Sequence, residues 1–319
     1  MAGPPLVTGA TGFAGSHLLD SLLRDEPVVA AWGNPRGRPL PSHADPRVRW
    51  TAVDLLDRQD VTVALAALRP GIIYHCAGVP HVAASWVDSG RALHVNVMGT
   101  HHLLDGLKEA AHVCPVLIVG SALVYEPSTG ALAEDHPIGP TTPYGVSKLA
   151  QEMLALRAAA DLPIFVARPF NHAGPRQSPE FVTASFAKQI AEIEAARARP
   201  VLRVGNLDAR RDITDVRDTV RAYRMIVAHG RPARPYNVCA GRAYRVGDLL
   251  DTLIALARTR VTLETDPARM RPSDTPVLLG DRSQIAAETG WLPEIPIERT
   301  LADLLDYWRG VVAPAPLPG

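Results

Sequence analysis

A short apolar strand, a glycine-rich turn and an amphipathic helix follow one another at the start of the chain. The strand covers residues 6–7, the turn carries Gly9, Gly12 and Gly15, and a helix is expected over 16–23. Glycines at this spacing let the backbone turn tightly and approach a pyrophosphate, while the N-terminus of the helix faces the phosphate charge. A glycine trio alone is weak evidence, but its place directly after a first strand predicts a dinucleotide-binding fold.

Further apolar strands alternate with helical stretches through the first half of the chain. They are expected at 28–32, 47–53, 71–76, 116–119 and 162–168. Such βα alternation predicts an α/β fold, a Rossmann-type doubly wound parallel sheet. Beyond these strands the alternation loosens without a repeat or a linker, so a smaller interleaved α/β substrate-binding domain is expected.

This organisation divides the 319 residues into two domains and a tail. The dinucleotide-binding domain is predicted to cover 1–170, with 212–240 also assigned to it. The substrate-binding domain takes 171–211 and 241–312. Residues 313–319 are too rich in proline to pack as regular structure, and they are expected to form a flexible tail.

Composition excludes several functional classes. Lys+Arg and Asp+Glu both number 33, so the formal net charge is zero and no nucleic-acid partner is expected. The three cysteines, Cys76, Cys114 and Cys239, are widely spaced and form no metal-binding pattern. No stretch approaches the roughly 20 apolar residues of a membrane helix, and no signal peptide precedes the first strand. A cytoplasmic protein without a metal or a membrane partner is predicted.

Tyr144 and Lys148 indicate a site of proton transfer. They lie four residues apart in a stretch with strong helix propensity, so both side chains are expected on one helix face. A positive charge within roughly 4–6 Å lowers the pKa of a phenol, and the pair is therefore expected to exchange a proton with a substrate oxygen. Ser121 follows the buried strand 116–119, where catalytic groups of open α/β sheets gather, and is the natural partner of Tyr144.

The end of the second strand bears on the choice of nicotinamide cofactor. An acid there would bind the ribose hydroxyls of NAD, but the sequence instead continues with Asn34 and two arginines, Arg36 and Arg38. These favour NADP, because a guanidinium suits the 2′-phosphate, and NAD remains open. The predicted cofactor contacts are Gly9, Thr11, Gly12, Phe13, Gly15, Asn34, Arg36, Asp54, Leu55, Ala77, Tyr144 and Lys148.

Taken together, the glycine motif, Ser121 and the Tyr144-x-x-x-Lys148 pair resemble the extended short-chain dehydrogenase/reductases that act on nucleotide sugars. Three further blocks narrow the resemblance to the branch of GDP-mannose 4,6-dehydratase and GDP-4-keto-6-deoxy-D-mannose reductase. These blocks are residues 168–175, 205–212 and 271–274.

The resemblance implies a role for each matching residue. Ser121, Tyr144 and Lys148 would be catalytic. The substrate contacts that it implies are Ser85, Asn171, Lys188, Arg211, Arg271 and Asp274. Dehydratases of this branch carry acidic residues directly after the strand-end serine or threonine, where this chain has Ala122 and Leu123. A leucine is no base, so the departure argues against dehydration.

The resemblance therefore implies reduction, by NADPH, of the C4 ketone of a nucleotide-linked 4-keto-6-deoxyhexose. It favours a GDP-linked substrate, which would give a GDP-6-deoxyhexose such as GDP-D-rhamnose. The alternatives are a nucleotide-sugar 4-epimerase, a residual GDP-mannose 4,6-dehydratase-like enzyme and, from another class, a non-catalytic NADP sensor. The helical stretches around 96–107 and 144–160 are where the family commonly pairs, so a homodimer is expected.

Overall fold

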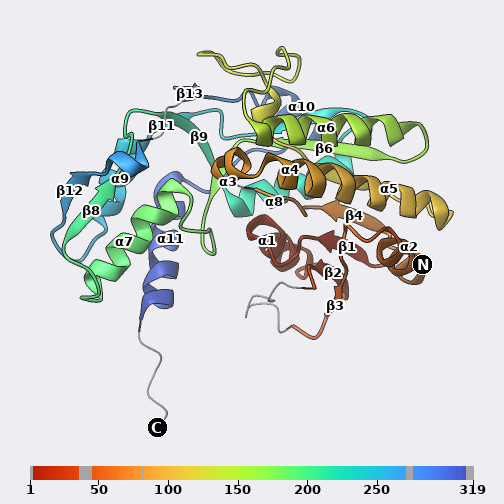
Figure 1. Cartoon of the computed structure of the whole chain (residues 1–319), viewed down its shortest axis with the longest axis horizontal. Helices are drawn as coiled ribbons and strands as arrows, with labels where there is room; N and C mark the ends of the chain where they lie inside the picture. The colour runs from red at the N-terminus through yellow and green to blue at the C-terminus, as the bar shows by residue number, and fades with distance from the viewer. Residues whose placement is uncertain (1–2, 36–44, 81, 271–275, 314–319) are drawn as a thin grey trace, which may run out of the picture.

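The computed structural model describes residues 3–35, 45–80, 82–270 and 276–313. Its centre is a seven-stranded parallel sheet with strand order β10-β6-β5-β4-β1-β2-β3 (Figure 1). The order reverses between β1 and β4, which creates a crevice at the carboxyl ends of these strands. The strands are β1 (Pro5–Thr8), β2 (Val29–Gly33), β3 (Val48–Ala52), β4 (Ile72–His75), β5 (Val116–Val119), β6 (Ile164–Pro169) and β10 (Pro235–Val238).

Helices cover both faces of this sheet, because successive side chains of a strand point to opposite faces. Val7 of β1 packs in one core with Leu18 and Tyr223, whereas Leu6 packs in another core with Leu103. The helices on the Val7 face are α1 (Phe13–Leu22), α8 (Val216–His229) and α10 (Ser283–Thr289). Those on the Leu6 face are α2 (Arg58–Leu68), α5 (Gly99–Glu109) and α6 (Pro143–Arg157). The Rossmann-type fold predicted from the sequence is confirmed.

A second, smaller group of elements lies at one end of the large sheet (Figure 1). Strands β7, β11 and β13 pair with the central β9, and β8 pairs with β12. Helices α7, α9 and α11 pack around a separate apolar core. The bounds are β7 (Asn171–Ala173), α7 (Val182–Glu194), β8 (Val201–Val204), β9 (Arg210–Asp215), β11 (Ala243–Arg245), α9 (Val246–Ala255), β12 (Thr262–Thr265), β13 (Val277–Leu278) and α11 (Ile297–Val312).

The division into domains stays a proposal, and two features differ from it. Strand β9 runs across the proposed boundary between 211 and 212. Ile285 and Trp291, assigned to the substrate-binding domain, pack in the core of the large sheet beside α8. Apolar residues of the proposed substrate-binding domain therefore contribute to the core of the dinucleotide-binding domain. The order of segments along the chain does not predict this, because burial depends on the tertiary fold. Of the proposed tail, only Ala313 lies within the described residues.

The segment between β4 and α5 contains three short helices. They are α3 (Val82–Val87), α4 (Ser89–Leu93) and a π-helix over His94–Met98. A single π turn inside a helical stretch is often found at functional sites. Short 3₁₀ turns cover Ala122–Val124, Ala158–Ala160 and Pro267–Arg269. Among the helices that the structure describes, none combines the length and apolar character needed to cross a membrane.

Candidate active site

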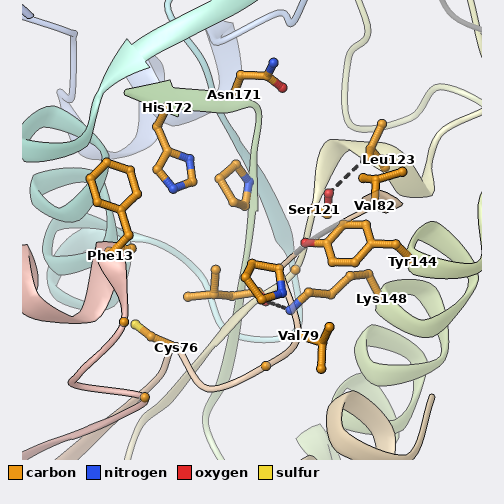
Figure 2. A pocket seen from close by; sticks show the side chains of 18 of the residues that line it. Phe13, Cys76, Val79, Val82, Ser121, Leu123, Tyr144, Lys148, Asn171 and His172 are labelled. Atoms are coloured by element: carbon orange, nitrogen blue, oxygen red, sulfur yellow. Dashed lines mark hydrogen bonds between the residues drawn. The ribbon is translucent and has the colours of Figure 1, made fainter. Parts of the chain in front are cut away.

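A cavity of about 1390 Å³ opens at the carboxyl ends of β1, β4, β5 and β6, where the strand order reverses. The glycine turn and the ends of β2 and β4 line one part of it, and α6, β7 and β9 line the other. Figure 2 shows Phe13 and Cys76 on one side, with Tyr144 and Lys148 facing them from α6. The cavity thus joins the predicted cofactor-binding turn to the predicted catalytic residues.

The glycine turn has no room for side chains at two positions. Gly9 has φ +66°, and a Cβ there would lie 2.6 Å from the backbone of Ala77. A Cβ on Gly15 would lie 2.3 Å from the carbonyl oxygen of Gly9, so this glycine lets α1 pack against the turn. Gly12 is the N-cap of α1 and lines the cavity with Thr11. Unsatisfied N–H groups at a helix start suit a diphosphate, and this cradle therefore fits a dinucleotide.

The far end of the cavity is formed by residues after β2 and β3. Asn34, Asp54 and Leu55 all line it. The Asp54 carboxylate accepts a hydrogen bond from the Leu56 N–H at 3.0 Å, which holds this turn in place. Arg36, predicted to bind a 2′-phosphate, lies outside the described residues together with Arg38.

Tyr144, Lys148 and Ser121 come together at the centre of the cavity (Figure 2). Their exposed fractions are 8%, 5% and 6%. Helix α6 begins at the N-cap Thr142, whose hydroxyl accepts from the Gly145 N–H at 3.0 Å, and this cap orients the first turn that carries Tyr144. The Tyr144 and Ser121 hydroxyls are hydrogen-bonded to each other. A ketone oxygen placed between these hydroxyls would meet two donors.

The expected effect of Lys148 on Tyr144 is corrected by the structure. Burial raises the pKa of Tyr144 to about 12, and the hydrogen bond from Ser121 only partly opposes this rise. Burial also lowers the pKa of Lys148 to about 8. The Lys148 ammonium is directed to the Val119 carbonyl oxygen at 2.8 Å and to the Gln151 side-chain oxygen at 2.9 Å. Burial therefore determines the pKa of Tyr144, and the phenol is held as a protonated acid.

Sequence reasoning missed a buried polar chain that supports these residues. Gln151 accepts from Lys148 and donates to the Thr100 hydroxyl at 2.8 Å. Asn96, in the π-helix, accepts from the Val79 N–H and donates to Ser147, both at 2.9 Å. The only signal in the sequence was polar residues within a helical stretch, which does not reveal their partners.

The predicted substrate residues divide into three groups. Asn171 and Arg211 line the cavity, and burial lowers the pKa of the Arg211 guanidinium, as expected of a cation withdrawn from water. Ser85 is fully buried, where its hydroxyl accepts from the Tyr144 N–H at 3.1 Å, and Lys188 pairs with Glu192 on α7. Neither of these two is among the residues that line the cavity. Arg271 and Asp274 lie outside the described residues.

An aromatic stack joins the cofactor turn to the substrate side. The rings of Phe13 and His172 are 5.6 Å apart and 7° from parallel. Nearby, the Arg176 guanidinium contacts the His17 ring at 2.7 Å and Asp20, both on α1. These contacts join the segment that follows β7 to helix α1, although the contacting residues are more than 150 positions apart in the sequence. No local sequence pattern predicts such a contact.

The chain matches the model of one protein family, GDP-mannose 4,6 dehydratase, over residues 6–304. It is 34% identical to GDP-6-deoxy-D-mannose reductase of Pseudomonas aeruginosa, with 96% of this chain and 97% of that protein covered. It is 30% identical to UDP-glucose 4-epimerase of Mycolicibacterium smegmatis, covering 95% of this chain and 98% of the relative. The solved structure of RMD from Pseudomonas aeruginosa complexed with NADPH superposes with a TM-score of 0.84 at 32% identity, covering 97% of this chain and all of the other.

Proposed function

This chain belongs to the GDP-mannose 4,6 dehydratase family of extended short-chain dehydrogenase/reductases, and we propose that it reduces the C4 ketone of a nucleotide-linked 4-keto-6-deoxyhexose with NADPH. One observation carries the proposal. Ser121, Tyr144 and Lys148 meet in the cavity, whereas the position that would need an acid for dehydration holds Leu123. The site therefore has the three side chains that a carbonyl reduction needs, and it has no base at position 123.

The residues have separate tasks in this reaction. The bound nicotinamide cofactor supplies the hydride. Tyr144 donates its phenolic proton to the C4 oxygen, because a phenol with a pKa of about 12 is fully protonated at neutral pH. Ser121 donates a second hydrogen bond to the same oxygen and orients the carbonyl. Lys148 would hold the ribose hydroxyls of the cofactor, and its positive charge would stabilise the negative charge that develops on the C4 oxygen.

A nucleotide diphosphate is the proposed recognition element of the substrate. Asn171 and Arg211 extend the cavity beyond the catalytic residues and offer an amide and a guanidinium, both suited to phosphate oxygens. A GDP-linked sugar, giving a product such as GDP-D-rhamnose, is proposed from the likeness to the Pseudomonas aeruginosa reductase. The assignment of Ser85, Lys188, Arg271 and Asp274 to the substrate rests on family resemblance.

A nucleotide-sugar 4-epimerase is the second candidate, because the chain is also 30% identical to such an enzyme. An epimerase uses the same three residues but regenerates its cofactor in every cycle. Net consumption of NADPH therefore separates the two activities. NADP is preferred to NAD, and comparing the two reduced cofactors at equal concentration tests that preference.

We also propose a cytoplasmic homodimer. Val146 and Met153 on α6 are 45% and 63% exposed, and Trp86 and Val87 are exposed on α3. Val146 and Met153 lie two turns apart on one face of α6, so they offer an apolar surface to a second copy. Met153→Lys is expected to shift the mass measured by light scattering from dimer to monomer, whereas a wild-type monomer would refute the proposal.

The first test mixes the protein with NADPH and GDP-4-keto-6-deoxy-D-mannose and follows the absorbance of the reduced nicotinamide. Stoichiometric loss of NADPH together with a GDP-6-deoxyhexose product is expected. If NADPH persists while the protein interconverts GDP- or UDP-hexoses, the epimerase is the correct assignment.

A further inference from the structure

We propose that Tyr223, on α8, is a cofactor-positioning residue whose hydroxyl hydrogen-bonds the carboxamide of the nicotinamide ring. This inference rests on the proposed use of a nicotinamide cofactor. Tyr223 was not among the residues predicted from the sequence, because its place in the middle of an amphipathic helix is typical of a core residue.

The first argument is an unpaired buried hydroxyl. Tyr223 is 0% exposed, and its ring packs in the core between α8 and the large sheet. Within the described part of the chain, its hydroxyl is one of three buried side-chain polar atoms without a hydrogen-bond partner, the others belonging to Thr214 and Trp308. A buried hydroxyl without a partner destabilises the fold. Phenylalanine would fill the same space without that cost.

The second argument is the position of this residue. Of the three residues with unpaired atoms, Tyr223 is the one that lines the large cavity. Cys76 and Tyr144 line the same cavity as Tyr223. Tyr223 approaches from the α8 face of the sheet, whereas Tyr144 approaches from α6. The two phenols therefore belong to helices on opposite faces of the sheet and line one cavity.

The third argument is chemical. The ring that delivers a hydride must lie near the Tyr144 hydroxyl, because hydride and proton reach adjacent atoms of one carbonyl. The carboxamide is the polar substituent of that ring, with both donor and acceptor atoms. A tyrosine hydroxyl is likewise a donor and an acceptor, and it can pair with either atom. The glycine turn would bind the diphosphate of the cofactor. The carboxamide is therefore the cofactor group that suits Tyr223.

Tyr223→Phe tests the proposal, and Tyr236→Phe is its matched control. The Tyr236 hydroxyl accepts from the Arg231 N–H at 2.7 Å and also binds Glu288, and it is not among the cavity-lining residues. For each protein, the melting temperature without ligand is measured. The dissociation constants of NADPH and of 2′-phospho-ADP-ribose, which lacks the nicotinamide, are measured by calorimetry.

Tyr223→Phe is expected to keep or raise the melting temperature, because it removes an unpaired polar atom. It is expected to weaken NADPH binding about 3- to 10-fold, the worth of one neutral hydrogen bond, without changing the affinity for the nicotinamide-free analogue. Tyr236→Phe should do the opposite, lowering the melting temperature and leaving NADPH affinity unchanged.

Equal NADPH affinity in Tyr223→Phe and the wild type would overturn the inference about Tyr223 alone. A matching loss of affinity for the nicotinamide-free analogue, or a lower melting temperature without ligand, would also overturn it, because either result indicates a structural role. Failure of the wild type to bind NADPH or NADH would instead overturn the proposed function, and this inference with it.

Discussion

The Lys148 ammonium donates a hydrogen bond to the Val119 carbonyl oxygen across 2.8 Å, at the last residue of β5. This bond draws the lysine towards the strand that carries Ser121 just beyond its end. Helix α6 and strand β5 are thereby joined at the point where the catalytic hydroxyls meet. The position of the ammonium in a buried setting also determines how the site responds to pH.

The alkaline limit of activity is expected to come from Lys148. Burial lowers the pKa of Lys148 from 10.5 to about 8, whereas burial raises the pKa of Tyr144 to about 12. The ammonium is charged below its pKa and neutral above it, so kcat/KM for NADPH should fall as the pH rises through about 8. Lys148→Arg, which stays charged, should have low activity but no decline in this range. A decline of the same shape in both proteins would contradict the assignment.

Tyr144→Phe is expected to reduce turnover by about 10²–10⁴-fold, the usual contribution of general acid catalysis. NADPH affinity should remain, because the phenyl ring keeps its packing and Lys148 is unchanged. Tyr307→Phe, on α11 in the smaller core, serves as the control and should retain turnover. Steady-state rates and NADPH titrations measure both effects. Near-normal turnover in Tyr144→Phe would disprove its role as the acid.

Leu123→Glu is expected to impair the reduction without creating dehydration. Leu123 lines the cavity beside Ser121, and its N–H donates to the Ser121 hydroxyl at 3.1 Å. A carboxylate there would bring a hydrated charge against the bound sugar, so kcat/KM for the ketone should fall roughly 10-fold or more while NADPH affinity is kept. Leu123→Met, which conserves volume, should behave nearly as wild type. Dehydration of GDP-mannose by Leu123→Glu would show that the site retains the rest of a dehydratase.

Arg168→Met is expected to destabilise the protein by about 3–5 kcal/mol, because it leaves a buried carboxylate without its partner. Arg168 and Glu152 are both buried and form two hydrogen bonds, at 3.0 and 2.5 Å. The double variant Glu152→Leu/Arg168→Met should recover most of the loss. The exposed pair Lys108–Asp161 is the control, and Lys108→Ala should cost less than about 1 kcal/mol. Urea unfolding measures each free energy, and equal losses for the two pairs would contradict the expectation.

Local sequence was sufficient for the fold class and for part of the site. Three of the patterns depend only on residues close together in the chain: the glycine turn, the apolar strands and the Tyr144–Lys148 spacing. Backbone geometry links each of these patterns to one local structure. The same holds for Ser121, because a residue that follows a buried parallel strand lies at the carboxyl edge of the sheet. The resulting fold and family predictions are confirmed.

Long-range packing decided the rest. Phe13 meets His172, and Tyr223 lines the same cavity as Tyr144, only because segments far apart in the sequence come together in the fold. The pKa of Tyr144 likewise depends on how completely the fold excludes water from its hydroxyl, which neighbouring residues in sequence do not reveal. The sequence by itself determined which chemical groups are present and which local elements carry them. The tertiary structure decided their contacts and their burial, because desolvation and contacts between distant segments arise only when the chain is packed.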